Sequence, residues 1–458
     1  MKNLLILGLG GLGGLGLLIG SLLSPLIAHA VEIDFENDSN LPIVYINAAI
    51  KGGSVTDPAG QEGIANFVGE MLLRGTQFKS KKEIDLILDQ MGARIEVEAR
   101  AESLIIRGAV LSSQLDNFLP LMSEIITAPN FPEDQIVKLK SEIISGIQEE
   151  LGHDASLASR KFIRFLFQNH PYGKSPMGKS ADIQSLTKEN ILSNYKKLFR
   201  QDSLLVIGSG DASREKISNW ATSVANSLNP ADGIPLELVN KPEDLTSTQL
   251  QIIDKPDRTQ TQIHIGQIGI RMTDKDFFPL YVGNHAFGGA SFAAILTDEI
   301  RVKRGWSYGA NSSFRQGLQP RSWHMHLYPA SKDTVAALSY SLKLISDLKT
   351  KGLTEKQFNF ARTSLLNSAG FTYNTPKKRV ENKLLERTLN LPTGFIKSFG
   401  TEIEKVTMAN TNSALSLFLK PTNLAVSVLS TSKNLKEGLA KAAGVALKDV
   451  KIIPFTQE

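Results

Sequence analysis

Asn66 and Glu70 are a polar pair whose types and spacing could support chemistry. They lie four residues apart within residues 63–76, where apolar side chains recur at the spacing of a helix that packs one face into a core. Asn66 and Glu70 therefore share another face of that helix. Their oxygen atoms could bind a hard cation, and the alternative is an ordinary solvated helix face. From the residues alone, the solvated face is the favoured interpretation.

Arg301 and Tyr308 form a second candidate pair, seven residues apart in the later part of the chain. A guanidinium and a phenolic hydroxyl are both hydrogen-bond donors suited to an oxygen on which negative charge develops. The structural alternative is that Arg301 ends a helix and favours its negative C-terminus, while Tyr308 fills a strand position. Spacing alone favours this structural alternative.

The cysteine and histidine content limits which other catalytic or metal-binding sites the chain could form. The chain contains no cysteine, which excludes disulfides, thiolate metal sites and cysteine nucleophiles. His324 and His326 would share one face of a strand and could chelate a metal, although alternating strand residues beside Trp323 are more often structural. The run His170-Pro171-Tyr172-Gly173 predicts a turn after a helix.

The composition is that of an ordinary globular protein. Of 458 residues, 41% are hydrophobic and 21% are charged, which excludes disordered, collagen-like and multi-span membrane proteins. The formal net charge is +5, and basic and acidic residues are interspersed. A nucleic-acid-binding surface needs a basic stripe free of acidic residues, so no nucleic-acid partner is expected.

Residues 1–30 have the pattern of a signal peptide. Lys2 precedes an apolar run, and Ala28-His29-Ala30 supplies the small residues that a signal peptidase recognises. Cleavage before Val31 would give an exported protein, periplasmic or secreted, with no stable membrane span. The alternative is an uncleaved anchor, because about 20 apolar residues can cross a bilayer.

The rest of the chain consists of two copies of one unit. Elements recur in the same order about 220 residues apart, which indicates a duplicated domain. The predicted organisation is a first domain over residues 31–228, a proline-punctuated linker over 229–248 and a second domain over 249–458. Alternating strands, expected at 43–50, 94–100, 103–110 and 262–270, precede runs of helices. This order predicts an α+β fold, in which helices pack on one side of a mostly antiparallel sheet in each domain.

The segment over residues 63–76 resembles the helix of the insulinase/pitrilysin family, the inverted zincins, which reads G-x-A-H-F-x-E-H-M-x-x-x-G-T. The shared frame positions are Gly63, Ala65, Phe67, Met71, Gly75 and Thr76. Further family features follow in order along the chain: Gly92, Asn169 to Gly173, Gly178, Arg258-Thr259, Phe287-Gly288-Gly289, Arg301, Gly305 and Tyr308. The resemblance covers essentially the whole chain after residue 30. It implies two homologous domains that form half of a clamshell chamber.

The catalytic residues of that family motif are absent. Asn66 and Glu70 stand at the two zinc-ligand histidine positions, and Gly69 stands where the family has its general-base glutamate. Zinc catalysis needs neutral imidazoles and a carboxylate base. The family's third ligand is a glutamate on a later helix, and Glu149 and Glu150 lie in the matching region. We expect no metal in this chain.

The resemblance implies a subunit of a two-chain peptidase. In such pairs one subunit keeps the zinc and the other supplies Arg301 and Tyr308 to its partner's catalytic site. Gly288 and Gly289 occupy the position of a substrate-binding loop that is longer in the family. The expected partners are a zinc-bearing homologous peptidase subunit, which would hold the zinc cofactor, and a peptide substrate. The alternatives are a stand-alone pseudopeptidase that binds peptides or scaffolds an envelope complex, and an enzyme with a different active site.

Overall fold

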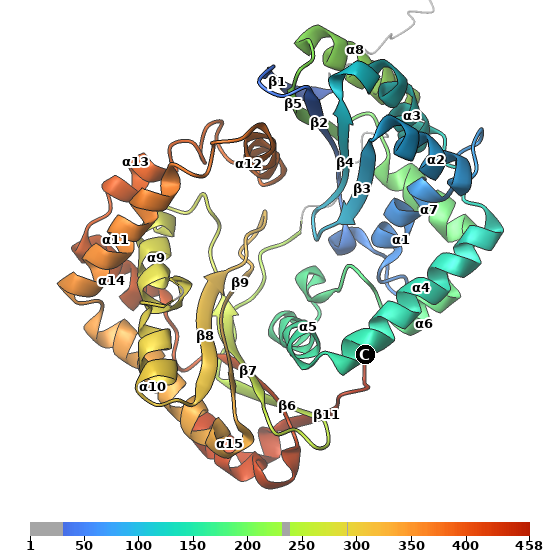
Figure 1. The fold of residues 1–458 in the computed structure, drawn as a ribbon. Coiled ribbons are helices and arrows are strands. Elements are labelled where there is room, and N and C mark those ends of the chain that lie inside the picture. Colours follow the sequence, from blue (N-terminus) through green and yellow to red (C-terminus); the bar gives the residue numbers. More distant parts are fainter. Residues whose placement is uncertain (1–30, 231–238, 291) are drawn as a thin grey trace, which may run out of the picture.

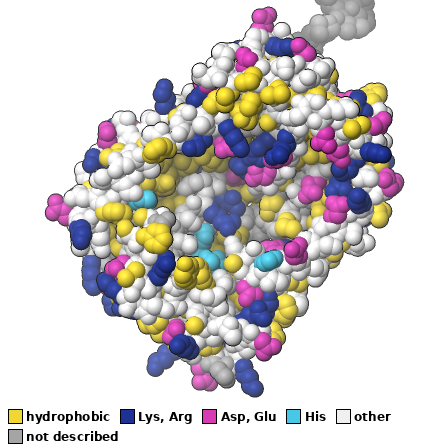
Figure 2. All heavy atoms as spheres, in the orientation of Figure 1, with side chains coloured by type: hydrophobic (Ala, Val, Ile, Leu, Met, Phe, Trp, Pro, Cys, Tyr) yellow, Lys and Arg dark blue, Asp and Glu magenta, His cyan; other side chains and the backbone are white. Residues whose placement is uncertain are grey.

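The computed structural model describes residues 31–230, 239–290 and 292–458, so the predicted leader lies outside the described residues. The chain forms two α+β halves that face each other (Figure 1). The space-filling view from the same side shows a surface hollowed between them (Figure 2). In the described part of the chain, no helix combines the length and apolar character needed to cross a bilayer.

The first half contains a five-stranded sheet in the order β1-β5-β2-β4-β3. Only the β1–β5 pair is parallel. The strands are β1 (Glu32–Asn37), β2 (Ile43–Lys51), β3 (Arg94–Ala99), β4 (Ser103–Leu111) and β5 (Leu204–Gly210). The helices are α1 (Ile64–Met71), α2 (Lys81–Met91), α3 (Leu115–Thr127), α4 (Glu133–Gly152), α5 (Asp154–Phe167), α6 (Ser180–Ser185), α7 (Lys188–Leu198) and α8 (Arg214–Ser227).

The second half repeats this plan with one extra strand, in the order β11-β6-β10-β7-β9-β8. Its strands are β6 (Gln249–Asp254), β7 (Gln262–Ile268), β8 (Ser307–Phe314), β9 (Ser322–Pro329), β10 (Ala425–Ser430) and β11 (Lys451–Pro454). Its helices are α9 (Phe277–Asn284), α10 (Thr334–Lys351), α11 (Glu355–Ala369), α12 (Pro376–Thr388), α13 (Phe399–Glu404), α14 (Met408–Phe418) and α15 (Lys436–Ala443).

The duplication extends to matching helix caps. Thr187 begins α7 by accepting a hydrogen bond from the backbone of Asn190, and Thr407 begins α14 by the same contact with Asn410. Such reciprocal caps satisfy N–H groups that would otherwise lack partners at a helix start. The predicted α+β fold of two homologous, mostly antiparallel sheets is therefore confirmed.

Each sheet divides its side chains between two apolar layers. In β2, Val44, Ile46 and Ile50 point into the core beneath the half's own helices, while Ala49 points to the other face. This alternation is the period of two that a strand imposes. The prediction of helices on one side only is wrong, because a helix from the other half covers the second face of each sheet.

The two covering helices are α5 and α12, and they cross between the halves (Figure 1). Val380 and Leu384 of α12 pack on the first sheet, against a layer formed by Ala49, Ile105, Leu205 and Ile207. Basic side chains of α12 also pair with acidic residues of β1, including Lys383 with Asp34 at 2.9 Å. Reciprocally, α5 packs Leu157 and Phe162 against the second sheet. Each half thus supplies a helix to the second apolar layer of the other, while the main core of each half is built from its own residues.

Candidate functional site

Helix α1 begins at a buried carboxyl group. The Asp57 carboxylate accepts hydrogen bonds from the backbone N–H groups of Gly63 at 2.7 Å and Ala65 at 3.1 Å. These N–H groups lie at the start of the helix and have no partner within it. Burial raises the pKa of Asp57 to about 7, although both hydrogen bonds oppose that shift. The cap fixes the position of the degenerate motif.

A close backbone crossing explains two glycines of the family frame. Gly63 has φ +99°, and a Cβ at this position would lie 2.7 Å from the Cα of Gly178. Gly178 has φ +79°, and its own Cβ would lie 2.1 Å from the carbonyl oxygen of Glu62. Only residues without a side chain allow this approach. The crossing holds the start of α1 against the segment before α6.

Asn66 and Glu70 lie together on α1, as their spacing predicts. The Asn66 side-chain amide donates to the Glu70 carboxylate at 2.9 Å, and both residues are half-buried. Gly69 faces the sheet instead. A Cβ there would lie 2.7 Å from Leu104 Cδ1 and 2.9 Å from Val97 Cγ1. Two apolar side chains therefore fill the space where a glutamate side chain would have to begin.

The two glutamates considered as third ligands make other contacts. Glu149 is exposed and lies 3.9 Å from His153. Glu150 forms an ion pair with Arg160 at 2.8 Å. Over residues 31–230, 239–290 and 292–458, no group of three histidine, aspartate or glutamate side chains is placed to hold a metal ion. The residues of the degenerate motif do not fit a catalytic zinc, which needs at least three such ligands.

The structure brings Arg301 and Tyr308 together. Arg301 lies in the helical turn Thr297–Val302, and Tyr308 lies on β8, an edge strand of the second sheet. The Arg301 guanidinium carbon lies 4.4 Å from the centroid of the Tyr308 ring and 5.3 Å from that of Phe292, within the range of cation–π contacts. Tyr308 is 74% exposed, which leaves its hydroxyl accessible to another molecule.

The two loop glycines have different surroundings. Gly288 is buried, and a Cβ there would lie 2.5 Å from the backbone nitrogen of Ser312. Its small size is therefore required for packing on β8. Gly289 is exposed. Contact between this loop and a substrate stays a prediction.

Sequence reasoning missed the role of Tyr172. The predicted turn is confirmed, because Pro171–Gly173 forms a single 3-10 turn. Tyr172 is also buried where the halves meet. Its hydroxyl donates to Glu102 of the first half and accepts from the backbone N–H of Gln319 of the second half at 2.9 Å. Burial raises the pKa of the Glu102 carboxyl. The family turn therefore joins the two halves, a role that only tertiary contacts reveal.

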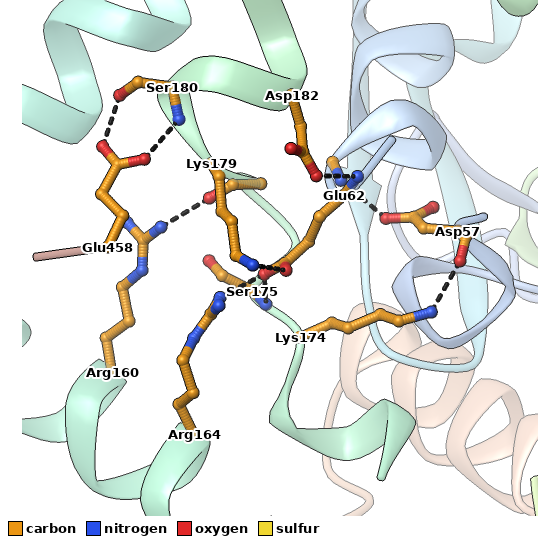
Figure 3. Close-up of polar contacts among 12 residues, drawn as sticks. Asp57, Glu62, Arg160, Arg164, Lys174, Ser175, Lys179, Ser180, Asp182 and Glu458 are labelled. Carbon is orange, nitrogen blue, oxygen red and sulfur yellow. Dashed lines mark hydrogen bonds and ion pairs between the residues drawn. The ribbon is translucent and has the colours of Figure 1, made fainter. Parts of the chain in front are cut away.

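Glu62 lies next to the close approach of Gly63 and Gly178 and pairs with two cationic side chains (Figure 3). Its carboxylate pairs with Arg164 of α5 and, at 3.5 Å, with Lys179. It also accepts a hydrogen bond from the backbone N–H of Ser175 at 2.9 Å. Glu62 therefore ties the start of α1 to the helix that crosses to the other half.

Sequence profiles of two related families match well over half of the chain. A profile described as "Insulinase (Peptidase family M16)" matches residues 33–179, and one described as "Peptidase M16 inactive domain" matches residues 185–365. The chain is similar to "Non-peptidase homolog YmxG" of Helicobacter pylori, with 24% identity over 408 residues. The match covers 88% of this chain and 92% of that protein.

Two further similarities agree with the profiles. The "Probable mitochondrial-processing peptidase subunit beta" of Arabidopsis thaliana is 20% identical over 285 residues, which cover 60% of this chain and 54% of that protein. The crystal structure of a peptidase M16 inactive domain from Pseudomonas fluorescens superimposes with a TM-score of 0.81 at 22% identity, covering 88% of this chain and 96% of that one. The two profile matches, over residues 33–179 and 185–365, place this chain in the insulinase family, peptidase family M16.

Proposed function

We propose that this chain is a zinc-less subunit that pairs with a zinc-bearing homologue to bind and cleave peptides. One observation carries the proposal: apolar side chains occupy the base position on α1, whereas Arg301 and Tyr308 are in contact and Tyr308 is exposed. In this arrangement the partner supplies the metal and the base. This chain supplies two hydrogen-bond donors, which hold the substrate carbonyl as negative charge develops on its oxygen.

The hollowed surface between the halves supports this assignment (Figure 2). Two chains of the same design, placed face to face, would enclose a chamber between their hollowed surfaces. The mitochondrial-processing peptidase relative is by its name one subunit of an enzyme, which is consistent with a partner chain here.

The test uses co-expression with a zinc-bearing homologue, confirmation of the complex by size-exclusion chromatography, and cleavage of unstructured peptides. Loss of one donor to a developing oxyanion typically lowers turnover by about 10²–10³-fold. We expect Arg301→Ala and Tyr308→Phe to reduce turnover of the complex by a similar factor while pairing is kept. Lys303→Ala removes an exposed cation directly after the same turn and serves as the control. Unchanged cleavage in both variants would contradict the assignment.

A stand-alone peptide-binding or scaffold protein is the second candidate. A groove of about 380 Å³ lies between β3 and α12, lined by side chains that include Tyr45, Arg94, Arg107 and Glu381. Strand β3 is an edge of its sheet, and an extended peptide can add to such an edge through backbone hydrogen bonds. Fluorescence anisotropy with labelled peptides and the chain alone separates the candidates. Saturable binding without a partner, together with failure to form a complex, would favour this function.

Export is part of the proposal. The pattern over residues 1–30 supports a periplasmic or secreted location, and N-terminal sequencing of protein from the native host should find Val31 first. Retention of the leader in that protein would instead indicate an anchored chain.

A further inference from the structure

A polar cavity of about 510 Å³ lies where the two halves meet, away from Arg301 and Tyr308. Four cationic side chains line it: Arg164 of α5, Lys174, Lys179, and Lys451 at the start of β11. Arg164, Lys174 and Lys179 belong to the first half and Lys451 to the second. The cavity is therefore formed only when the two halves are assembled.

The positive charge in this cavity is incompletely neutralised. Glu62 is the one carboxylate of the described lining, and it already pairs with Arg164 and Lys179. Lys174 donates to the backbone carbonyl oxygen of Asp57 at 2.6 Å. Neither Lys174 nor Lys451 forms an ion pair with any residue that the structure describes. The lining thus holds four cationic side chains and one carboxylate, Glu62, and the Asp57 carboxyl outside the lining also attracts Lys174.

Amide side chains are also part of the lining, contributed by Gln168, Asn169 and Gln249. His170 lines the cavity too, but both of its ring nitrogens already contact backbone groups: Nε2 the Asn240 carbonyl oxygen at 2.7 Å, and Nδ1 the Tyr172 N–H at 3.2 Å. Amides can bind the hydroxyl groups of an organic ligand. The cavity is much larger than a single phosphate ion, so its volume suits a phosphate that carries a small polar organic group.

We propose that this cavity is a binding site for a phosphorylated small molecule, held by Arg164, Lys174, Lys179 and Lys451. The cationic groups favour a dianionic phosphate over carboxylates, each of which carries only one charge, because a phosphate concentrates its charge and acceptor oxygens on one group, and arginine suits its geometry. Because both halves line the cavity, a bound ligand bridges them and stabilises their assembly.

The test is isothermal titration calorimetry of the purified chain at low ionic strength, with inorganic phosphate, ribose 5-phosphate, ribose and glutarate as separate probes. We expect saturable binding of the two phosphates, no binding of ribose, and weaker binding of glutarate. Tighter binding of ribose 5-phosphate than of inorganic phosphate supports an organic phosphate as the ligand. Equal affinities of the two phosphates support an anion site whose ligand is free phosphate.

Variants locate the site. We expect Lys451→Gln and Lys179→Gln each to weaken phosphate binding about three- to tenfold, in line with the loss of one partly exposed charge contact. Lys448→Gln, which removes an exposed lysine three residues before Lys451, should leave the affinity unchanged. The proposal is overturned if neither phosphate binds, if glutarate binds as tightly as phosphate, or if Lys448→Gln weakens binding as much as Lys451→Gln.

Discussion

At the scale of single residues, position 69 connects the missing base of the family motif to packing. Gly69 lies under Leu104 and Val97, which are part of the core of the first half or pack against it. A side chain at position 69 has to displace them. The substitution that removes the family's base is therefore accompanied by apolar residues that occupy the same space.

The first prediction follows from this contact. Gly69→Ala should lower the free energy of unfolding by about 1–3 kcal/mol, the usual effect of overpacking a core. Gly146→Ala is the matched control, because Gly146 lies within α4 with its nearest neighbour at an ordinary 3.4 Å. It should be neutral or raise stability by up to about 1 kcal/mol. Urea denaturation measures both variants, and equal effects would contradict the close contact at Gly69.

The second prediction concerns metal binding. We expect the triple variant Asn66→His, Gly69→Glu, Glu70→His to bind no stoichiometric zinc, as we also expect of the parent chain. The third ligand is missing, because Glu149 points to solvent and Glu150 is held by Arg160. Elemental analysis of both purified proteins is the measurement. One tightly held zinc ion per chain in the triple variant would show that a third ligand is available after all.

At this scale the sequence predicts some contacts and misses others. The spacing of Asn66 and Glu70 places them on one helix face, and the structure pairs them. The partners of Tyr172 are 70 and 147 residues away in the chain, and no local pattern encodes such separations.

At the scale of elements, period-two alternation predicts β2 and β4 to within a residue or two, because each face of these strands packs against a different layer. The crossing of α5 and α12 could not be predicted, because an amphipathic pattern shows that a helix buries one face without showing which sheet receives it. The short strands β1 and β6 form through parallel pairing with strands that are distant in the chain. No local sequence pattern predicts them.

The contact of α5 with the second sheet leads to a third prediction. Phe162 of α5 stacks on His264, which lies beside His324 and His326 with Arg315 nearby. Burial lowers the pKa of His324 to about 3 and that of His326 to about 4, from an ordinary 6.5. The folded protein keeps these rings neutral. The unfolded chain binds more protons below pH 6.5, so stability is lost as the pH falls from about 6.5 towards 4.

His324→Gln should reduce that acid-dependent loss. Between pH 7 and pH 5 the decrease in unfolding free energy should be smaller than in the parent chain by about 2 kcal/mol, the linkage expected for one histidine that stays neutral in the folded state. Asp57, with its raised pKa, has the opposite pH dependence in both proteins and cancels in the comparison. His153→Gln, at an exposed position, is the control. An unchanged pH dependence in His324→Gln would contradict burial of a neutral ring.

At the scale of the whole molecule, the exchanged helices make each half dependent on the other. The fourth prediction is that residues 31–228 and 249–458, expressed separately, are insoluble or aggregate. Each separated half retains a sheet whose second apolar layer has lost its covering helix. Co-expression of the two pieces should restore a soluble 1:1 complex, measured by size-exclusion chromatography. Soluble, monomeric halves would contradict the dependence of each sheet on a helix of the other half.

The exchange of α5 and α12 also bears on how such a chain could have arisen. The two helices occupy equivalent places in the duplicated units, each directly after the long helix α4 or α11. A single ancestral unit would carry one uncovered sheet face and one unpartnered helix, and a second identical copy would satisfy both. The present chain is then the covalent fusion of a domain-swapped homodimer. After fusion the two copies could diverge independently. The first copy could then lose its zinc ligands while the second kept the hydrogen-bond donors Arg301 and Tyr308.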